Sequence, residues 1–245
     1  MQDQASAPGL IGFVSRVLAL AVQLAFLVAV GTLVYVVFFR QPPARPAAAA
    51  AGGGAGEPVA IEGETRIPVD AIEFRGSPAA KVVVGEFADV DCPYCLRWVS
   101  GARPAFEKRF VESGQVRFAF FQLPLPMHPG AEAAAVAMEC AGSQGAFWPM
   151  HDLLFRPDRP RDRDGFVASA AVLDLDSEMF GKCLTNPPPK VGRDQALAAE
   201  LGINGTPTFI VGTFDADGAI RPRFKIVGAP NERRLADLIK QLVAN

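Results

Sequence analysis

Residues 81–95 read KVVVGEFADVDCPYC, and this stretch holds the two features that decide the fold. The run at 81–88 is short and rich in β-branched residues, which is typical of a strand buried on both faces. It leads into the motif CPYC at residues 92–95, where Pro93 suits the first turn of a helix. The stretch therefore predicts a buried strand followed by a helix that begins at two cysteines.

The position of these cysteines at a helix N-terminus predicts a reactive pair. The first turn of a helix presents unpaired N–H groups and roughly half a positive charge, which stabilise a thiolate at Cys92. Cys95 lies one turn deeper, where it is expected to be less exposed but close enough to form a disulfide with Cys92. We therefore expect Cys92 to be the nucleophile and Cys95 to resolve a mixed disulfide, with Pro93 fixing the approach geometry.

Two other interpretations of the motif receive less support. A zinc site needs two further ligands, yet Cys140 and Cys183 are isolated and the two histidines, His128 and His151, form no second paired motif. A purely structural bridge within CPYC closes too small a loop to contribute much stability. Neither a metal nor another cofactor is therefore expected.

Cys140 and Cys183 are the two cysteines outside the motif. Four cysteines allow three pairings, and only a Cys140–Cys183 pair respects the local motif at Cys92 and Cys95. Such a bridge would close a loop of about 44 residues, worth about 4 kcal/mol in the chain-entropy model, which points to a structural disulfide. A second shuttling pair is the alternative, although neither cysteine has a CxxC context.

The segments after the motif predict an α/β domain. Helix character extends from the motif to Glu112, with Pro104 forcing a kink or break. The next elements are expected as a strand at 115–122, helices between about 129 and 201 with the last ending at Gly202, strands at 208–211 and 223–227, and a helix at 232–243. A helical insertion at about 129–201 thus lies within a single domain at 61–245.

The most apolar segment of the chain is VLALAVQLAFLVAVGTLVYVVFF at residues 17–39. It is long enough to cross a hydrocarbon core of about 30 Å as a helix, whereas the apolar region of a signal peptide typically has about 7 to 15 residues. A signal peptide cleaved near 48–51 is the alternative. We expect a transmembrane anchor at 17–39, after a short cytoplasmic N-terminus at 1–16, and a flexible Pro/Ala/Gly linker at 40–60.

Charge and chemistry disagree about the orientation of this anchor. Arg16 precedes the apolar segment while Arg40 and Arg45 follow it, so the positive-inside rule mildly opposes an external domain. Persistent disulfides, however, are expected only in an oxidising compartment. We therefore expect a single-pass protein of the inner membrane whose domain lies on the periplasmic side.

Composition excludes two broad classes of protein. Half of the 245 residues are hydrophobic, so the chain is not expected to be disordered throughout. The 24 basic residues nearly balance the 26 acidic residues and form no dense basic stripe. Nucleic acid is therefore not an expected partner.

Four stretches of the sequence together resemble the DsbA-like branch of the thioredoxin superfamily, from about residue 79 to the C-terminus. They are EFADVDCPYC at 86–95, LPLPMHPGA at 123–131, CAGSQGAFWPMHDLLF at 140–155 and GTPTFIVG at 205–212. The resemblance implies a thioredoxin fold with a helical insertion, which agrees with the predicted order of elements.

The resemblance also implies roles for several residues. Pro207 corresponds to a cis-proline that faces the dithiol, and the backbone of Thr206 beside it would bind an extended substrate segment as an added strand. Pro93 and Tyr94 are the other candidate substrate-binding residues. Glu86 corresponds to a buried acid under the dithiol. Desolvation raises the pKa of a buried carboxyl, so it can exchange a proton with the resolving thiol; a solvated or capping glutamate is the alternative.

The remaining polar residues near these motifs are given no catalytic role. Asp89 and Asp91 are interpreted as surface or turn residues, and a negative charge beside Cys92 is expected to oppose thiolate formation. His128 and His151 match the family stretches but are assigned to packing or capping.

The sequence as a whole predicts a thiol–disulfide oxidoreductase. Its expected partners are thiol-containing secreted or envelope proteins and a membrane redox protein that recycles the dithiol. A disulfide-forming oxidase is the leading hypothesis, although the same dithiol run backwards gives a reductase or isomerase. A tethered binding or chaperone module whose disulfides are all structural is the alternative from another class.

Overall fold

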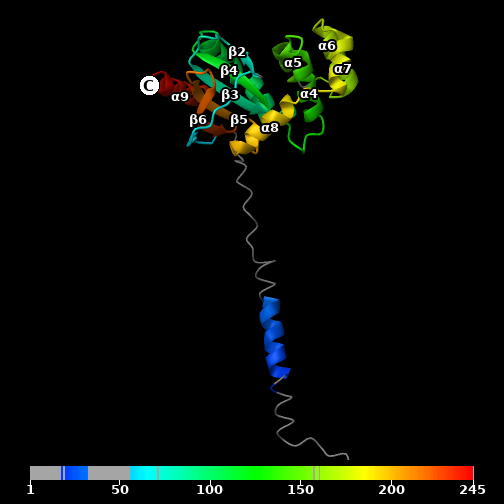
Figure 1. Cartoon of the computed structure of the whole chain (residues 1–245), viewed down its shortest axis with the longest axis vertical. Helices are drawn as coiled ribbons and strands as arrows, with labels where there is room; N and C mark the ends of the chain where they lie inside the picture. Colours follow the sequence, from blue (N-terminus) through cyan, green and yellow to red (C-terminus); the bar gives the residue numbers. More distant parts are fainter. Residues whose placement is uncertain are drawn as a thin grey trace, which may run out of the picture. The chain divides into compact units, whose positions relative to one another are not determined.

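The computed structural model describes residues 18, 20–32, 56–70, 72–156, 158–159 and 161–244. The chain divides into two units, Met1–Ala51 and Gly52–Asn245. In the first unit, residues 18 and 20–32 are helical (Figure 1, blue). Among the described residues, no helix has both the length and the apolarity needed to cross a membrane. The rest of the predicted anchor, the N-terminus at 1–16 and most of the predicted linker lie outside the described residues.

The described part of the second unit is built on a six-stranded mixed sheet with the strand order β1-β6-β5-β3-β4-β2. The strands are β1 Val59–Ala60, β2 Glu73–Arg75, β3 Val82–Ala88, β4 Val116–Gln122, β5 Thr208–Phe214 and β6 Ile220–Val227. β3 runs parallel to β4 and antiparallel to β5. Because β3 lies inside the sheet and is buried at every position, it fixes the start of the following helix firmly.

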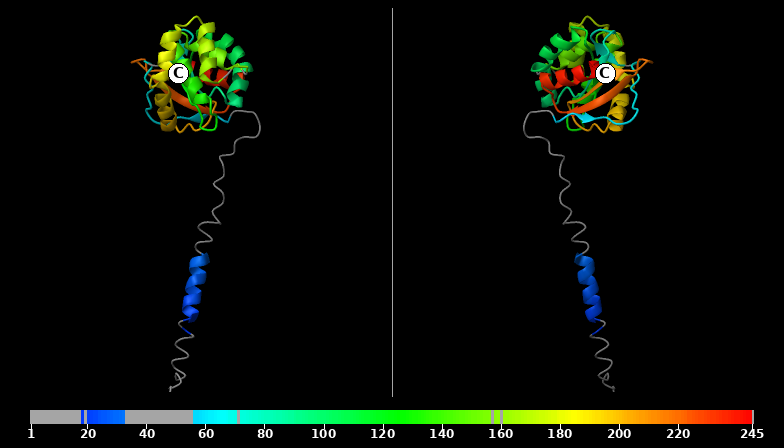
Figure 2. Two further views of the ribbon diagram at one scale, coloured as in Figure 1. Left: turned by 90° about the vertical axis from the view of Figure 1, so that its right-hand side faces the viewer. Right: turned by 90° about the vertical axis from the view of Figure 1, so that its left-hand side faces the viewer.

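Helices cover both faces of this sheet. They are α2 Pro93–Ser100, α3 Arg103–Phe106, the π-helical turn η1 Glu107–Val111, α4 Ala131–Gly142, α5 Phe147–Leu154, α6 Arg163–Val172, α7 Ser177–Thr185, α8 Lys190–Glu200 and α9 Glu232–Val243. Side chains alternate across a strand, so Val82 packs with Trp98 of α2 and Leu235 of α9, whereas Val83 packs with Ala198 of α8. Figure 2 shows α8 in yellow-orange and α9 in red on opposite sides of the orange strands.

Helices α4 to α7 form a separate apolar cluster beside the sheet, as Figure 1 shows. Two of them begin at capping aspartates: Asp162 accepts from the N–H of Gly165 at 2.8 Å, and Asp176 from the N–H of Met179 at 2.8 Å. Buried aromatic side chains of the insertion fill the cluster, and both cysteines of CPYC belong to it. The dithiol therefore lies where the insertion meets the sheet.

The observed elements confirm the predicted α/β order with a helical insertion. The helix predicted up to Glu112 breaks between α2 and α3, at Gly101, and Pro104 then occupies the first turn of α3, where a proline is tolerated. The edge strands β1 and β2 were not predicted, because two or three residues show no periodicity. β5 and β6 each run three residues beyond their predicted bounds, toward the turn that joins them.

Candidate active site

Cys92 and Cys95 are free thiols at the N-terminus of α2. Cys92 is the N-cap residue in an extended conformation, and Pro93 takes the first helical position. Cys92 is 3% exposed and Cys95 is fully buried, which places Cys92 nearer the surface. Tyr94, between them, is 46% exposed, and the guanidinium of Arg97 lies 4.8 Å from the centre of its ring.

The two thiols have opposite acid–base properties. A hydrogen bond from the Cys95 thiol is the largest cause that lowers the pKa of Cys92 to about 5; bonds from Thr206 and from the backbone N–H groups of Cys95 and Tyr94 add to it, against the effect of burial. Burial, followed by the bond to Cys92, raises the pKa of Cys95 well above its ordinary value. At neutral pH the pair therefore holds a thiolate at Cys92 and a thiol at Cys95.

The loop before β5 lies against this pair. The peptide bond between Thr206 and Pro207 is cis, and the Cys92 thiol donates to the carbonyl oxygen of Thr206, with Sγ and O 3.3 Å apart. The Thr206 hydroxyl is buried and has no other partner within the described ranges, so it is available to donate to the Cys92 thiolate. Thr206 can thus hydrogen-bond both protonation states of the sulfur.

Glu86 is a buried acid on β3, with 0% exposure. Its Oε2 accepts from Trp98 Nε1 at 3.0 Å, while its Oε1 has no hydrogen-bond partner among the described residues. Burial raises the pKa of Glu86 to about 8, although Arg103 and the bond from Trp98 oppose the shift. The negative charge that Glu86 carries when it is ionised also raises the pKa of Cys95, so the protonation states of the buried carboxyl and the buried thiol are coupled.

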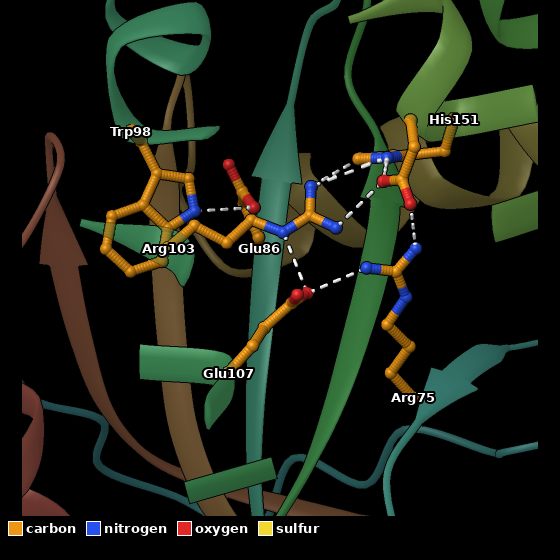
Figure 3. Close-up of polar contacts among 7 residues, drawn as sticks. Arg75, Glu86, Trp98, Arg103, Glu107 and His151 are labelled. Atoms are coloured by element: carbon orange, nitrogen blue, oxygen red, sulfur yellow. Dashed lines mark hydrogen bonds and ion pairs between the residues drawn. The ribbon is translucent and has the colours of Figure 1, made fainter. Parts of the chain in front are cut away.

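A network of charged side chains around Arg103 lies near Glu86 (Figure 3). Arg103 is only 3% exposed and donates to Glu107 at 2.9 Å and to Asp152 at 3.1 Å. Arg75 also donates to Glu107 at 2.9 Å and pairs with Asp152. The two guanidinium groups thus pair with two carboxylates. The positive charge of Arg103 also acts on Glu86 and opposes the rise of its pKa.

His151 packs at the far end of this network. It is fully buried, its ring stacks on Phe155 with centroids 4.4 Å apart, and its Nδ1 lies 3.0 Å from Asp152 Oδ1. Burial is the first cause that lowers the pKa of His151 to about 3, so the imidazole is neutral. This position confirms the packing interpretation of His151.

Asp89 is a turn residue, as one of the two interpretations had it, but the structure corrects its placement at the surface. Asp89 is 2% exposed, and its carboxylate accepts from the backbone N–H groups of Asp91 and Leu125 at 2.8 Å each. Its Oδ2 lies 2.7 Å from Nδ1 of His128. The charge of Asp91, which was expected to oppose thiolate formation, is paired with Arg161 at 2.7 Å.

Three residues at this site were missed in the sequence: Asp89, Arg103 and His128. Asp89 lies only three residues before Cys92, but its contacts with Leu125 and His128 join segments that are distant in the sequence. The same is true of the contact of Arg103 with Asp152. One usable signal was that Asp89 directly follows a strand buried along its whole length. Within the described residues, no group of three or more His, Cys, Asp or Glu side chains could hold a metal ion.

Cys140 of α4 and Cys183 of α7 form a disulfide, with the sulfurs 2.05 Å apart and the Cα atoms 5.6 Å apart. The bridge joins two helices of the insertion and spans 43 residues of sequence. Cys140 is fully buried in the apolar cluster of the insertion. This placement supports a structural role for the bridge, separate from that of the CPYC pair.

Replacing both Cys140 and Cys183 with alanine is expected to lower the free energy of unfolding by about 4 kcal/mol, because the denatured chain regains its loop entropy. Exchange at Cys92 should persist, since the hydrogen bonds that lower the pKa of Cys92 come from Cys95, Tyr94 and Thr206. Thermal unfolding under non-reducing conditions measures the first effect and alkylation of Cys92 the second. An unchanged stability, or loss of Cys92 reactivity in the folded variant, would contradict the assignment.

Comparison with known proteins gives one family match and several matches of fold. Residues 71–223 match the thioredoxin family. Among solved structures, BdbD from Bacillus subtilis superposes with a TM-score of 0.62 at 22% identity, covering 76% of this chain and 99% of that chain. A thioredoxin-like oxidoreductase from Silicibacter pomeroyi DSS-3 superposes with a TM-score of 0.59 at 25% identity, covering 72% and 94%.

Curated relatives include much longer proteins. A Na(+)/H(+) antiporter NhaA 1 of Salinispora arenicola is 37% identical over 185 residues, which make up 73% of this chain but 27% of the antiporter. A Na(+)/H(+) antiporter NhaA 3 of Salinispora tropica is 39% identical over 160 residues, or 24% of its length. The chain therefore spans about a quarter of the length of the curated relatives it matches.

Proposed function

Because this chain belongs to the thioredoxin family, we propose that it is a thiol–disulfide oxidoreductase that forms disulfides in secreted or envelope proteins. One observation carries the proposal: two cysteines three residues apart have opposite pKa shifts, with a nucleophilic thiolate at Cys92 and a buried thiol at Cys95. The fold likeness to a protein named as a thioredoxin-like oxidoreductase supports it.

In the proposed reaction, a substrate thiolate attacks Sγ of Cys92 in the oxidised protein. The bond between the two cysteines breaks, and Cys95 leaves with the electron pair. Glu86, protonated at neutral pH, supplies a proton to the Cys95 thiolate, whose pKa is higher than its own. A second substrate thiolate then attacks the substrate sulfur of the mixed disulfide, and Cys92 leaves as a thiolate. The substrate gains a disulfide, and the protein is left with Cys92 and Cys95 in the reduced dithiol state.

Substrate binding is proposed at the cis-proline loop. The carbonyl of Thr206 accepts from the Cys92 thiol in the reduced protein, and it is released when Cys92 loses that proton. An extended substrate segment could then pair with the Thr206 backbone as an added strand. Pro93 and Tyr94 are both exposed in the first turn of α2, where they can contact the same segment.

The direction of exchange follows from the thiolate. Whatever stabilises the Cys92 thiolate stabilises the reduced protein, because the disulfide carries no charge that could benefit. The low pKa of Cys92 therefore favours transfer of the disulfide to the substrate over a reductase or isomerase role. A membrane redox protein would have to reoxidise the dithiol after each cycle.

Selective reduction separates this function from a tethered binding module whose cysteines are all structural. Mild reductant followed by alkylation and mass mapping is expected to label Cys92 and Cys95 and to leave Cys140 and Cys183 bridged, because only the first pair has an activated thiolate. If none of the four cysteines is released under these conditions, the binding module replaces the enzyme.

We also propose that residues 17–39 anchor the protein in the inner membrane with its domain on the periplasmic side. The length of the apolar segment and the disulfide chemistry of the domain support this placement. A reporter active only in the periplasm and fused after Asn245 should be active, and the intact chain should stay with the membrane through alkaline extraction. A soluble mature form that begins near Ala50 would instead identify a cleaved signal peptide.

A further inference from the structure

His128 lies in the loop between β4 and α4, where it contacts a buried carboxylate in the turn that precedes Cys92. Its Nδ1 donates to Oδ2 of Asp89 across 2.7 Å. The Asp89 side chain is fully buried, whereas the His128 side chain is 20% exposed. Nδ1 is therefore occupied by the bond to Asp89, and Nε2 is the other nitrogen of a ring that is partly accessible to solvent.

Asp89 fixes the positions of His128 and Cys92 together. Its Oδ2 also accepts from the N–H of Leu125, at the start of the loop that carries His128. Its Oδ1 accepts from the N–H of Asp91, and its backbone carbonyl accepts from the N–H of Cys92 at 3.1 Å. A single residue thus connects the loop between β4 and α4 with the turn that precedes Cys92.

The charges that most strongly raise the pKa of His128 are acidic. They are Asp89 and Asp91 in the turn after β3 and Cys92 at the head of α2; Asp91 is shared with Arg161, which lies just before α6. Burial acts against a positive imidazole, but the bond to Asp89 and the charges of Asp89, Cys92 and Asp91 together raise the pKa of His128. The interaction with Cys92 is reciprocal, so an imidazolium at this position favours the thiolate.

We propose that His128 is a positioning residue for Cys92: the imidazolium held by Asp89 stabilises the thiolate that leaves when a mixed disulfide is resolved. The two residues inside CPYC, Pro93 and Tyr94, carry no positive charge. The loop between β4 and α4 supplies one instead, at His128. The inference rests on the proposed function, because it assigns a role at the same dithiol. It goes further by linking the acidity of Cys92 to a residue outside the motif.

A His128→Gln variant tests the inference through ionisation of Cys92 in the full-length reduced protein. The amide can keep a hydrogen bond to Asp89 but carries no charge. The loss of a nearby positive charge raises the pKa of a thiol, and a rise of about one unit lowers the thiolate fraction at about pH 5 about fivefold. Ultraviolet thiolate absorbance and the rate of Cys92 alkylation across the pH range both report this change.

His128→Lys is the matched variant, because it restores a positive charge without restoring the imidazole bond. It is expected to bring the Cys92 titration back toward the wild-type curve. Equal titrations of wild type and His128→Gln would overturn the inference, as would an equal rise of the Cys92 pKa in both variants, which would show a purely structural role.

Glutathione exchange by the wild-type protein distinguishes this inference from the proposed function. If wild-type Cys92 exchanges but His128→Gln leaves its titration unchanged, the function stands and the role of His128 fails. If the wild-type dithiol does not exchange while His128→Gln still raises the pKa of Cys92, the electrostatic role stands and the proposed function fails.

Discussion

Cys95→Ala is expected to accumulate mixed disulfides with envelope proteins, whereas Cys92→Ala should form none. In the first variant Cys92 loses the bond from the Cys95 thiol but keeps those from Thr206 and from the backbone N–H groups, so its thiolate still attacks a partner and no second thiol remains to release it. In the second variant Cys95 is still fully buried, and burial is the first cause that raises its pKa. In the wild-type protein the difference in thiolate fraction alone makes Cys92 more than about a hundred times more reactive than Cys95 at neutral pH.

Non-reducing gels of cells that express each variant, with mass mapping of the trapped species, measure this difference. The matched control is the variant that lacks Cys140 and Cys183, which keeps both active-site cysteines and should trap no more partner than wild type. Equal trapping by Cys92→Ala and Cys95→Ala would show that the nucleophile is wrongly assigned.

Glu86→Gln is expected to remove a large pH-dependent penalty on stability. Burial raises the pKa of Glu86 to about 8, against about 4.3 for an unfolded glutamate. The native state therefore binds more protons than the unfolded state between these values, and this residue's contribution to stability falls as pH rises through that window. The shift corresponds to about 5 kcal/mol above pH 8, so the variant should gain stability relative to wild type as pH rises from about 4.5 to about 8.

Denaturant unfolding of the oxidised proteins across this pH range measures the effect, because an oxidised Cys92 does not titrate. Burying the amide of the glutamine changes the free energy of unfolding by an amount that does not vary with pH. The test is therefore how the stability difference between variant and wild type changes with pH. Glu139→Gln is the matched control: Glu139 is also buried, burial raises its pKa to about 7, and Gln122 donates to it at 3.0 Å.

Both variants should therefore flatten the pH dependence of stability, but only Glu86→Gln should slow the step in which the bond between Cys92 and Cys95 breaks and Cys95 takes up a proton. Slowing of this step in both variants would show that Glu86 has no specific role in proton transfer. A stability difference between Glu86→Gln and wild type that does not change with pH would contradict its raised pKa.

The dithiol and its setting could be predicted because their signals are local in the sequence. A β-branched run, a proline in the first helical turn and two cysteines three apart are enough to place a buried strand before a reactive helix N-terminus. The pattern also predicted the helical insertion, because alanine-rich amphipathic segments follow one another without strand signals. Cis-Pro207 came from a family resemblance, since an X-Pro bond is cis in only about 5 to 6% of cases in folded proteins.

The charged surroundings of the dithiol could not be predicted, because they depend on contacts between distant segments. Asp89 is a turn residue whose burial could not be predicted, because its carboxylate is covered by the distant loop at Leu125. Arg161 compensates Asp91 from 70 residues away. Arg103 follows a helix break that the sequence placed at Pro104, and its partner Asp152 comes from the distant helix α5.

Equilibration with glutathione buffers tests the central claim, that Cys92 and Cys95 form an oxidising dithiol. The fractions of reduced and oxidised protein at each buffer ratio, with mass mapping to show that only these two cysteines change state, give its reduction potential. The potentials of known dithiols run from about −270 mV for thioredoxin through about −200 to −230 mV for glutaredoxins to about −120 mV for DsbA. We predict a value above about −230 mV, with the reduced form more stable to denaturant than the oxidised form. A value at or below about −270 mV would contradict the oxidase and make the protein a reductase.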